Sequence, residues 1–263
     1  MRVAERGFAL LIVLWTLVLV TLIVTHVVTA ARQETRLAEN LRSAAELGEI
    51  ADGGVQEAVF HLLDKSAGHW RADGAPHRSA GPSGALEIRI FSEAGKVNLN
   101  TAQVELLAAL LRETGLERLK AEAIANAIVV WRTPKGEAPA MAAAYKQAGL
   151  GYAPPNAQFE SVREVGHVLG VTPAILERIE PYLTVHHDGG TDGAAADPVV
   201  RQALKDVFGQ VPTGGPSGPD EAFVDVRTTV TRGAAHAERE AIVRIGPTPK
   251  GRLYEILGWR GAP

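Results

Sequence analysis

One stretch near the N-terminus of this 263-residue chain limits its possible folds more than any other feature. No Asp, Glu, Lys or Arg occurs between Arg6 and Arg32, a gap of 25 residues, while 54 of the 57 charged residues follow it. As a helix the gap would span about 37 Å, enough to cross a bilayer core of about 30 Å. Arg2 and Arg6 precede the apolar run, which favours a cytoplasmic N-terminus. We therefore expect a single membrane span with the remaining chain on the far side.

A cleavable secretory signal peptide is the alternative for the same segment. Val28-Thr29-Ala30 resembles a small-residue cleavage site, but the apolar run is longer than the usual core of about 7–15 residues. Helical patterning also continues beyond it. Small or apolar residues recur at alternating steps of four and three, which predicts a stalk helix over residues 32–65 with one seam facing a partner. These residues are Leu37, Leu41, Ala44, Gly48, Ala51, Val55, Ala58 and Leu62. Gly53-Gly54 is expected to interrupt this helix.

Residues 66–84 are rich in Gly, Ser, Pro and His, and predict a loop. Alternating apolar positions around Ile88 predict a strand, and three more candidates lie near the C-terminus, at 222–230, 240–245 and 253–259. The last is apolar on both faces, which favours a central strand. The residues between these strands read as helices, including a Ser161–Glu164 capping box and a stop at Gly170. The pattern predicts an α+β fold in which a helical domain is inserted into an antiparallel sheet.

Catalytic and metal-binding signatures are scarce. The chain has no cysteine, and no zinc-protease, nucleophile-elbow, P-loop or dinucleotide-binding motif, so we do not expect an enzyme. Asp188, Asp192 and Asp197, beside His186-His187, are candidates for calcium, although a solvated polar loop is the favoured interpretation. Asn98 and Asn100 are interpreted as turn and N-cap residues. The balance of 27 basic against 30 acidic residues argues against a nucleic-acid partner.

The N-terminal segment resembles the class III leader of type IV pilins and type II secretion pseudopilins. The resemblance lies in Arg6-Gly7-Phe8-Ala9-Leu10-Leu11. It implies cleavage by a prepilin peptidase between Gly7 and Phe8, N-methylation of Phe8, and an apolar helix that assembles a filament. Within that helix we expect contacts at Leu11, Leu14 and Trp15, and further along at Leu37 and Leu41. Ile12 stands where most members have Glu, a carboxylate thought to neutralise the amine of the next subunit.

The minor pseudopilin K family also lacks this Glu, and in this respect the chain resembles that family. Its subunit has no other subunit ahead of it in the filament. Further segments resemble that family: 95–102, 161–172, 180–185 and 254–260. The resemblance implies a leader (1–7), a transmembrane helix (8–31) and a periplasmic stalk (32–65). It also implies a pilin-like domain (66–97 and 212–263) and an inserted helical domain of helix-hairpin-helix or SAM-like type (98–211).

The function implied by the resemblance is that of a pseudopilus tip subunit held in the inner membrane, with its body in the periplasm. Its partners would be other minor pseudopilins, the major pseudopilin below the tip, and the prepilin peptidase. The alternatives are a minor pilin of a type IV pilus, a periplasmic helix-hairpin-helix protein that binds DNA, and a secreted domain. The turn 169–172 lacks the second glycine of a DNA-binding hairpin and has mixed flanking charge, so a structural hairpin is favoured.

Overall fold

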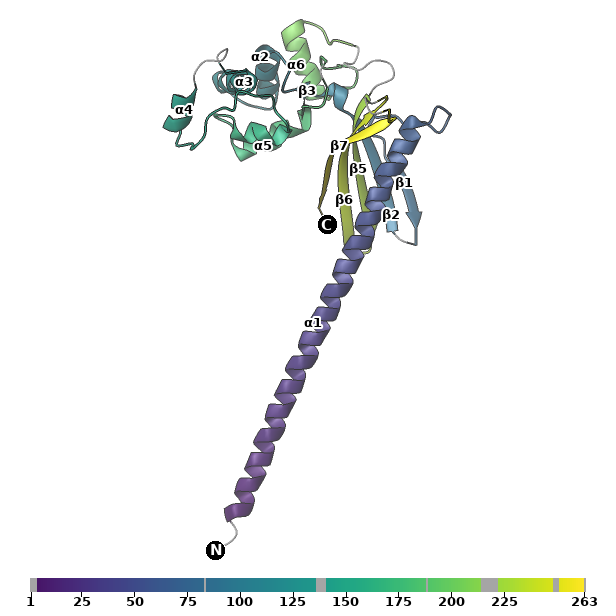
Figure 1. The fold of residues 1–263 in the computed structure, drawn as a ribbon, viewed down its shortest axis with the longest axis vertical. Coiled ribbons are helices and arrows are strands. Elements are labelled where there is room, and N and C mark those ends of the chain that lie inside the picture. Colours follow the sequence, from purple (N-terminus) through teal and green to yellow (C-terminus); the bar gives the residue numbers. More distant parts are fainter. Residues whose placement is uncertain are drawn as a thin grey trace.

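A single helix, α1 (Ala4–Leu63), forms the long axis of the molecule. The computed structural model describes residues 4–82, 84–135, 141–187, 189–213, 222–247 and 251–262. With 60 residues, α1 extends about 90 Å at about 1.5 Å per residue. Its N-terminal part stands clear of the rest of the chain, and its C-terminal part lies along a sheet (Figure 1). Over Leu10–Leu63 it is the one described helix apolar and long enough to cross a membrane.

The sheet contains five antiparallel strands in the order β1-β2-β5-β6-β7. They are β1 (His77–Gly81), β2 (Gly84–Ser92), β5 (Ala222–Arg232), β6 (Ala235–Ile245) and β7 (Tyr254–Ala262). Ile88 of β2 pairs with Thr228 of β5, which in turn pairs with Arg239 of β6. The sheet therefore joins segments more than 130 residues apart in the chain, as the sequence pattern predicts.

Helix α1 packs its C-terminal third against one face of this sheet. Ala51, Val55 and Ala58 are fully buried, and the hydroxyl of Thr228 donates to the carbonyl of Ala51 at 2.9 Å. Small residues on this helical face permit that approach. The expected interruption at Gly53-Gly54 is wrong, because α1 runs through both residues. A Cβ on Gly54 would lie 3.1 Å from Leu86 Cδ1 and Thr228 Cγ2, so this glycine serves close packing instead.

Two other strand expectations need correction. Residues 66–84 are expected to form a loop because of their polar composition, but they contain the short strand β1. The rings of His61, Trp70 and His77 stack with centroids 4.0 and 3.8 Å apart, and this stack holds the segment against α1. The last strand, β7, lies at the edge of the sheet instead of its centre. Two of its apolar residues are exposed at that edge, Leu257 at 39% and Trp259 at 42%.

The helices form a second body between β2 and β5. They are α2 (Val104–Glu113), α3 (Arg118–Arg132), α4 (Ala142–Gln147), α5 (Pro173–Ile179) and α6 (Pro198–Phe208), with 3-10 turns η1 (Glu93–Gly95), η2 (Val162–His167) and η3 (Glu180–Tyr182). The same body contains a two-stranded parallel sheet, formed by β3 (Val97–Asn98) and β4 (Leu183–Thr184). Leu107, Ile128 and Ile175 belong to one separate apolar core. This α+β architecture with a helical body between sheet strands confirms the predicted fold class.

The segment around Gly170 is a tight turn between η2 and α5. Glu164 accepts a hydrogen bond from the Ser161 N–H at 2.8 Å, in keeping with the predicted capping box. Gly170 has a φ of +88°, a left-handed conformation that suits glycine. Thr172 caps α5 by accepting from Ile175 N–H. The first element is a 3-10 helix instead of the expected α-helix.

Candidate functional site

The exposed N-terminal part of α1 is the first candidate site, because apolar side chains surround it on every side. Leu11, Ile12, Leu14 and Trp15 are all exposed, with Trp15 at 67%. Thr16 and Thr21 donate to carbonyls one turn earlier, at 2.9 and 2.8 Å, so their hydroxyls do not need water. This surface can be buried only by lipid or by other apolar helices. The expected cut between Gly7 and Phe8 lies within α1. The side chains of these two residues lie outside the part of the chain that the structure describes.

Leu37 and Leu41 lie farther along α1, between the apolar segment and the sheet. They are 60% and 62% exposed, and the buried seam begins only at Leu47. The predicted continuous seam is therefore divided: its second half packs on the sheet, and the leucines of its first half are exposed among the residues that the structure describes. Arg42 and Glu46 form an exposed ion pair at 2.9 Å beside it. Leu37 and Leu41 are thus available to a neighbouring molecule.

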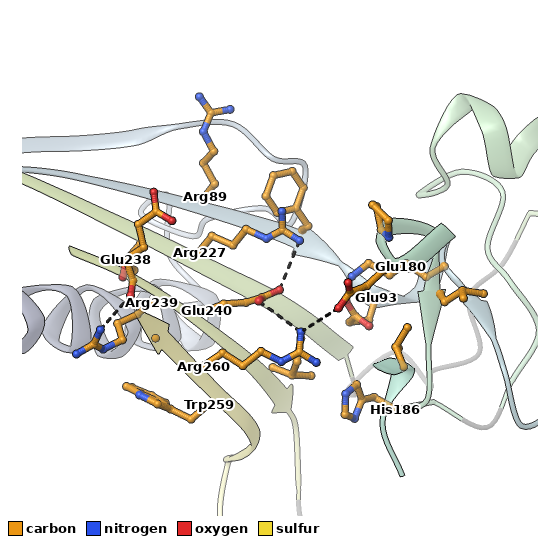
Figure 2. A pocket seen from close by; sticks show the side chains of 18 of the residues that line it. Arg89, Glu93, Glu180, His186, Arg227, Glu238, Arg239, Glu240, Trp259 and Arg260 are labelled. Atoms are coloured by element: carbon orange, nitrogen blue, oxygen red, sulfur yellow. Dashed lines mark hydrogen bonds and ion pairs between the residues drawn. The ribbon is translucent and has the colours of Figure 1, made fainter. Parts of the chain in front are cut away.

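The second candidate site is a cleft of about 1030 Å³ between the sheet and the helical body (Figure 2). Its floor is the sheet face opposite α1, and its far wall comes from η2, α5 and η3. Six acidic and six basic residues line it. They are Glu87, Glu93, Glu177, Glu180, Glu238 and Glu240, and Arg89, Lys96, Arg163, Arg227, Arg239 and Arg260.

A chain of ion pairs with alternating sign crosses this cleft. On the sheet, Arg227 lies 2.7 Å from Asp225 and 3.5 Å from Glu240. Glu240 lies 3.6 Å from Arg260 of β7, which reaches Glu180 of the helical body at 3.9 Å (Figure 2). Arg163 approaches Glu180 from its other side at 3.2 Å. The network thus joins the sheet to the helical body without excess charge of either sign.

Beneath this network lies a buried group of charges. Asp225 is fully buried, and Lys96 lies between its carboxylate, at 3.6 Å, and that of Glu93. Burial lowers the pKa of Arg227, but its hydrogen bonds to Asp225 and the charges of Asp225 and Glu240 outweigh burial and raise that pKa. Burial lowers the pKa of His186, with Glu93 opposing it. The buried acids are therefore matched by cations.

The junction between the two bodies depends on close backbone contacts. A Cβ on Gly95 would lie 2.3 Å from the carbonyl oxygen of Ala195, so only glycine fits there. The N–H of Asp192 donates to the carbonyl of Ala94 at 2.8 Å. The segment that carries the calcium candidates therefore packs against η1.

Two of the three calcium candidates, Asp192 and Asp197, lie within the described residues. Asp188 lies outside them. The carboxylates of Asp192 and Asp197 accept from the N–H groups of Ala194 and Val199, each at 2.9 Å, and Asp197 caps α6. Across the described ranges there is no cluster of three His, Asp or Glu residues suited to a metal.

Asn98 and Asn100 have a role that the sequence pattern missed. Asn98 accepts from Asn100 N–H at 2.6 Å, the expected turn, and also donates to the carbonyl of His187. Asn100 binds both backbone groups of Phe159, donating at 3.0 Å and accepting at 2.8 Å. The N-cap of α2 is Gln103, so the N-cap interpretation is wrong. These amides tie distant segments of the helical body together.

Comparison with known protein families gives a match for part of the chain. Residues 85–188 match the family described as Type II secretion system (T2SS), protein K. The similarity to that family therefore lies in this segment of the chain. The match covers β2, the junction and the helical body as far as His187, which is the part that distinguishes this fold from a simple helix-and-sheet unit. Comparison with curated proteins gave no match.

A solved structure has the same fold over nearly its full length. It is a chain in the crystal structure of the GspK-GspI-GspJ complex from the type 2 secretion system of enterotoxigenic Escherichia coli. The TM-score is 0.57 at 13% identity, and the alignment covers 89% of this chain and 99% of that chain. The resemblance to the protein K family noted in the sequence is thereby confirmed, and the likeness in structure concerns the fold.

Proposed function

We propose that this protein is a minor pseudopilin at the tip of a type II secretion pseudopilus. It would be inserted in the inner membrane by α1, with the N-terminus in the cytoplasm and the sheet and helical bodies in the periplasm. Cleavage after Gly7 and methylation of Phe8 by a prepilin peptidase would prepare it for assembly. Its role would be structural, with no catalytic step.

The observation that carries this proposal is the position of the helical body. It lies beyond the end of the sheet, at the far end of the molecule from the N-terminus of α1, and projects to one side (Figure 1). If subunits stack along α1, a subunit added above would have to occupy that space. Ile12 supports the same position, because a subunit without a neighbour above has no amine for a carboxylate to neutralise.

The exposed surfaces of α1 suggest how the subunit joins its neighbours. Its apolar segment, including Leu11, Leu14 and Trp15, would be transferred from lipid into the apolar centre of the filament. Leu37 and Leu41 would continue this contact above the membrane. By analogy with the solved complex, the neighbours would be two other minor pseudopilins, counterparts of GspI and GspJ, with the major pseudopilin below them.

Localisation of the protein on filaments tests the proposal. Overproduction of the major pseudopilin together with the minor subunits should give surface pseudopili, and antibodies against the helical body should label one end of each. A strain lacking this protein should fail to secrete its substrates until the gene is restored. Label along the whole filament, or unimpaired secretion in the deletion strain, would contradict a tip role.

A further inference from the structure

Strand β7 has a hydrogen-bonded neighbour on only one side. It pairs with β6 from Tyr254 to Ala262, and the sheet order places it at the edge opposite β1. Among the described residues no strand lies along its outer side. A strand edge of this kind presents a row of backbone N–H and C=O groups that can pair with another extended chain.

The two edges of the sheet differ in how well they are protected. Edge strand β1 has five residues, and Arg78 at its start pairs with Glu87 of β2 at 2.6 Å. Edge strand β7 has nine residues, with neither proline nor lysine among them, and its register against β6 shifts between Ile242 and Val243, which indicates a bulge. Short strands, prolines, lysines and bulges are common protections against edge pairing. By its greater length and its lack of proline and lysine, the β7 edge is the more open of the two.

Apolar side chains accompany the open edge. Trp259 and Leu257 are 42% and 39% exposed. Trp259 pairs with Ala241, a fully buried residue in the core that includes α1 residues, so Trp259 lies on the α1 side of the sheet. Tyr254 still reaches α1, where its hydroxyl lies 3.3 Å from Gln56 Oε1. Exposed tryptophans at such sites are frequent centres of protein–protein interfaces.

The other face of β7 is charged and opens into the cleft. Arg260 pairs with Glu240 in register and lines the cleft. Glu255 pairs with Arg244, which alternation places on the same face of β6 as Glu240. An occupant of this edge would meet an apolar surface on the α1 side and charged groups on the cleft side.

We infer that β7 receives an amphipathic β-strand from a second minor pseudopilin, which extends the sheet past its C-terminal edge. The inference rests on the proposed function. The open backbone groups select an extended segment, because the backbone of a helix has its donors and acceptors already paired. The side chains select the pattern: apolar residues facing Trp259 and Ile256 on the α1 side, and charged residues facing Glu255 and Arg260 on the cleft side.

Hydrogen exchange of the full chain tests the inference directly. The protein is purified in detergent alone and together with the counterparts of GspI and GspJ, and exchange is followed by mass spectrometry. We expect peptides covering 254–262 to exchange about ten-fold more slowly in the complex, while those covering 77–81 are unchanged. A complex without protection of β7 overturns the inference and leaves the proposed function intact; failure to form any complex contradicts both.

Matched substitutions supply the second arm. Leu257→Lys and Trp259→Lys together should weaken the complex about ten-fold or more, because a desolvated charge opposes strand pairing. Ser79→Lys, on the β1 edge, is the control and should assemble normally. Circular dichroism verifies folding; should the double variant misfold, Leu257→Lys alone is tested. Normal assembly by a folded Lys variant overturns the inference, as does protection of β7 in the chain alone, which would indicate self-association.

Discussion

Arg260 of β7 and Glu180 of the helical body lie 3.9 Å apart, and this pair is where the ion-pair network passes from the sheet to the helical body. Glu180 also receives Arg163 from its own body at 3.2 Å. One carboxylate therefore serves two arginines, one on each side of the cleft. The orientation of the helical body, which carries the proposed capping role, depends in part on this contact.

Glu180→Gln should loosen the orientation of the helical body with little effect on folding. The pair is partly exposed, so we expect a loss of at most about 1 kcal/mol in unfolding free energy. Because the chain has no cysteine, two spin labels can be attached specifically to introduced cysteines. Double electron–electron resonance between the two bodies should show a broader distance distribution. Glu122→Gln, which breaks an exposed pair within α3, is the control; equal distributions in both variants would contradict the prediction.

Asn100→Asp should destabilise the helical body. The amide of Asn100 satisfies both backbone groups of Phe159, and a carboxylate would keep the acceptor while placing a second oxygen against the Phe159 carbonyl. We expect a loss of about 1–3 kcal/mol in unfolding free energy, measured by urea denaturation. Asn126→Asp is the control, since Asn126 donates to the carbonyl of Glu122 one turn earlier on the exposed face of α3. Equal stability of the two variants would refute this role.

The adjacent glycines of α1 should respond oppositely to substitution. Gly53 has no atom within 4 Å of an added Cβ, so Gly53→Ala should stabilise the helix by about 1 kcal/mol. Gly54 lies against Leu86 and Thr228, so Gly54→Leu should cost about 1–3 kcal/mol through overpacking. Thermal unfolding of the full chain in detergent measures both. Stabilisation by both substitutions would show that helix propensity, and not sheet contact, decides at these positions.

The structure around these glycines shows why the sequence pattern predicts only part of the fold. The spacing of small residues correctly predicts a helix with one seam that faces a partner, because helical periodicity is a local property. It does not reveal that Gly54 meets Leu86 and Thr228, since that contact joins segments distant in the chain. Strand β1 escaped prediction for the same reason: its polar residues form a strand through pairing with β2 and the stack of His61, Trp70 and His77.

The candidate site divides in the same way. The apolar part of α1 and the unusual Ile12 can be found from the sequence, because charge depletion and a leader motif are linear features. The cleft network cannot, because Glu180, Glu240 and Arg260 become neighbours only after three separate segments fold together. Their one linear signal is the polar face of the predicted strands, which indicates exposure but not partners.

Glu46 should contribute to stability in a pH-dependent manner. Hydrogen bonds from Arg42, then from Arg232, hold the pKa of its carboxyl below the ordinary value. Its stabilising effect is therefore fully present above the unfolded-state pKa and is lost as the pH falls through the folded-state pKa. The melting temperature of wild type should exceed that of Glu46→Gln at about pH 7, and the difference should shrink as the pH falls below the ordinary range of a carboxyl group. Glu49→Gln, an exposed neighbour, is the control; a difference that persists in acid would contradict the prediction.

Ile12→Glu should impair secretion if the protein occupies the filament tip. A carboxylate at this position within an apolar helix bundle needs a cation, and a subunit with no neighbour above has no amine to supply one. We expect secretion well below the wild-type level, at normal protein abundance by immunoblotting, in a deletion strain that carries the variant. Ile12→Leu, which conserves volume and polarity, should restore secretion and serves as the control. Full secretion by Ile12→Glu would show that the missing carboxylate is not a requirement of the tip, and it would leave the position of the helical body as the remaining support for that role.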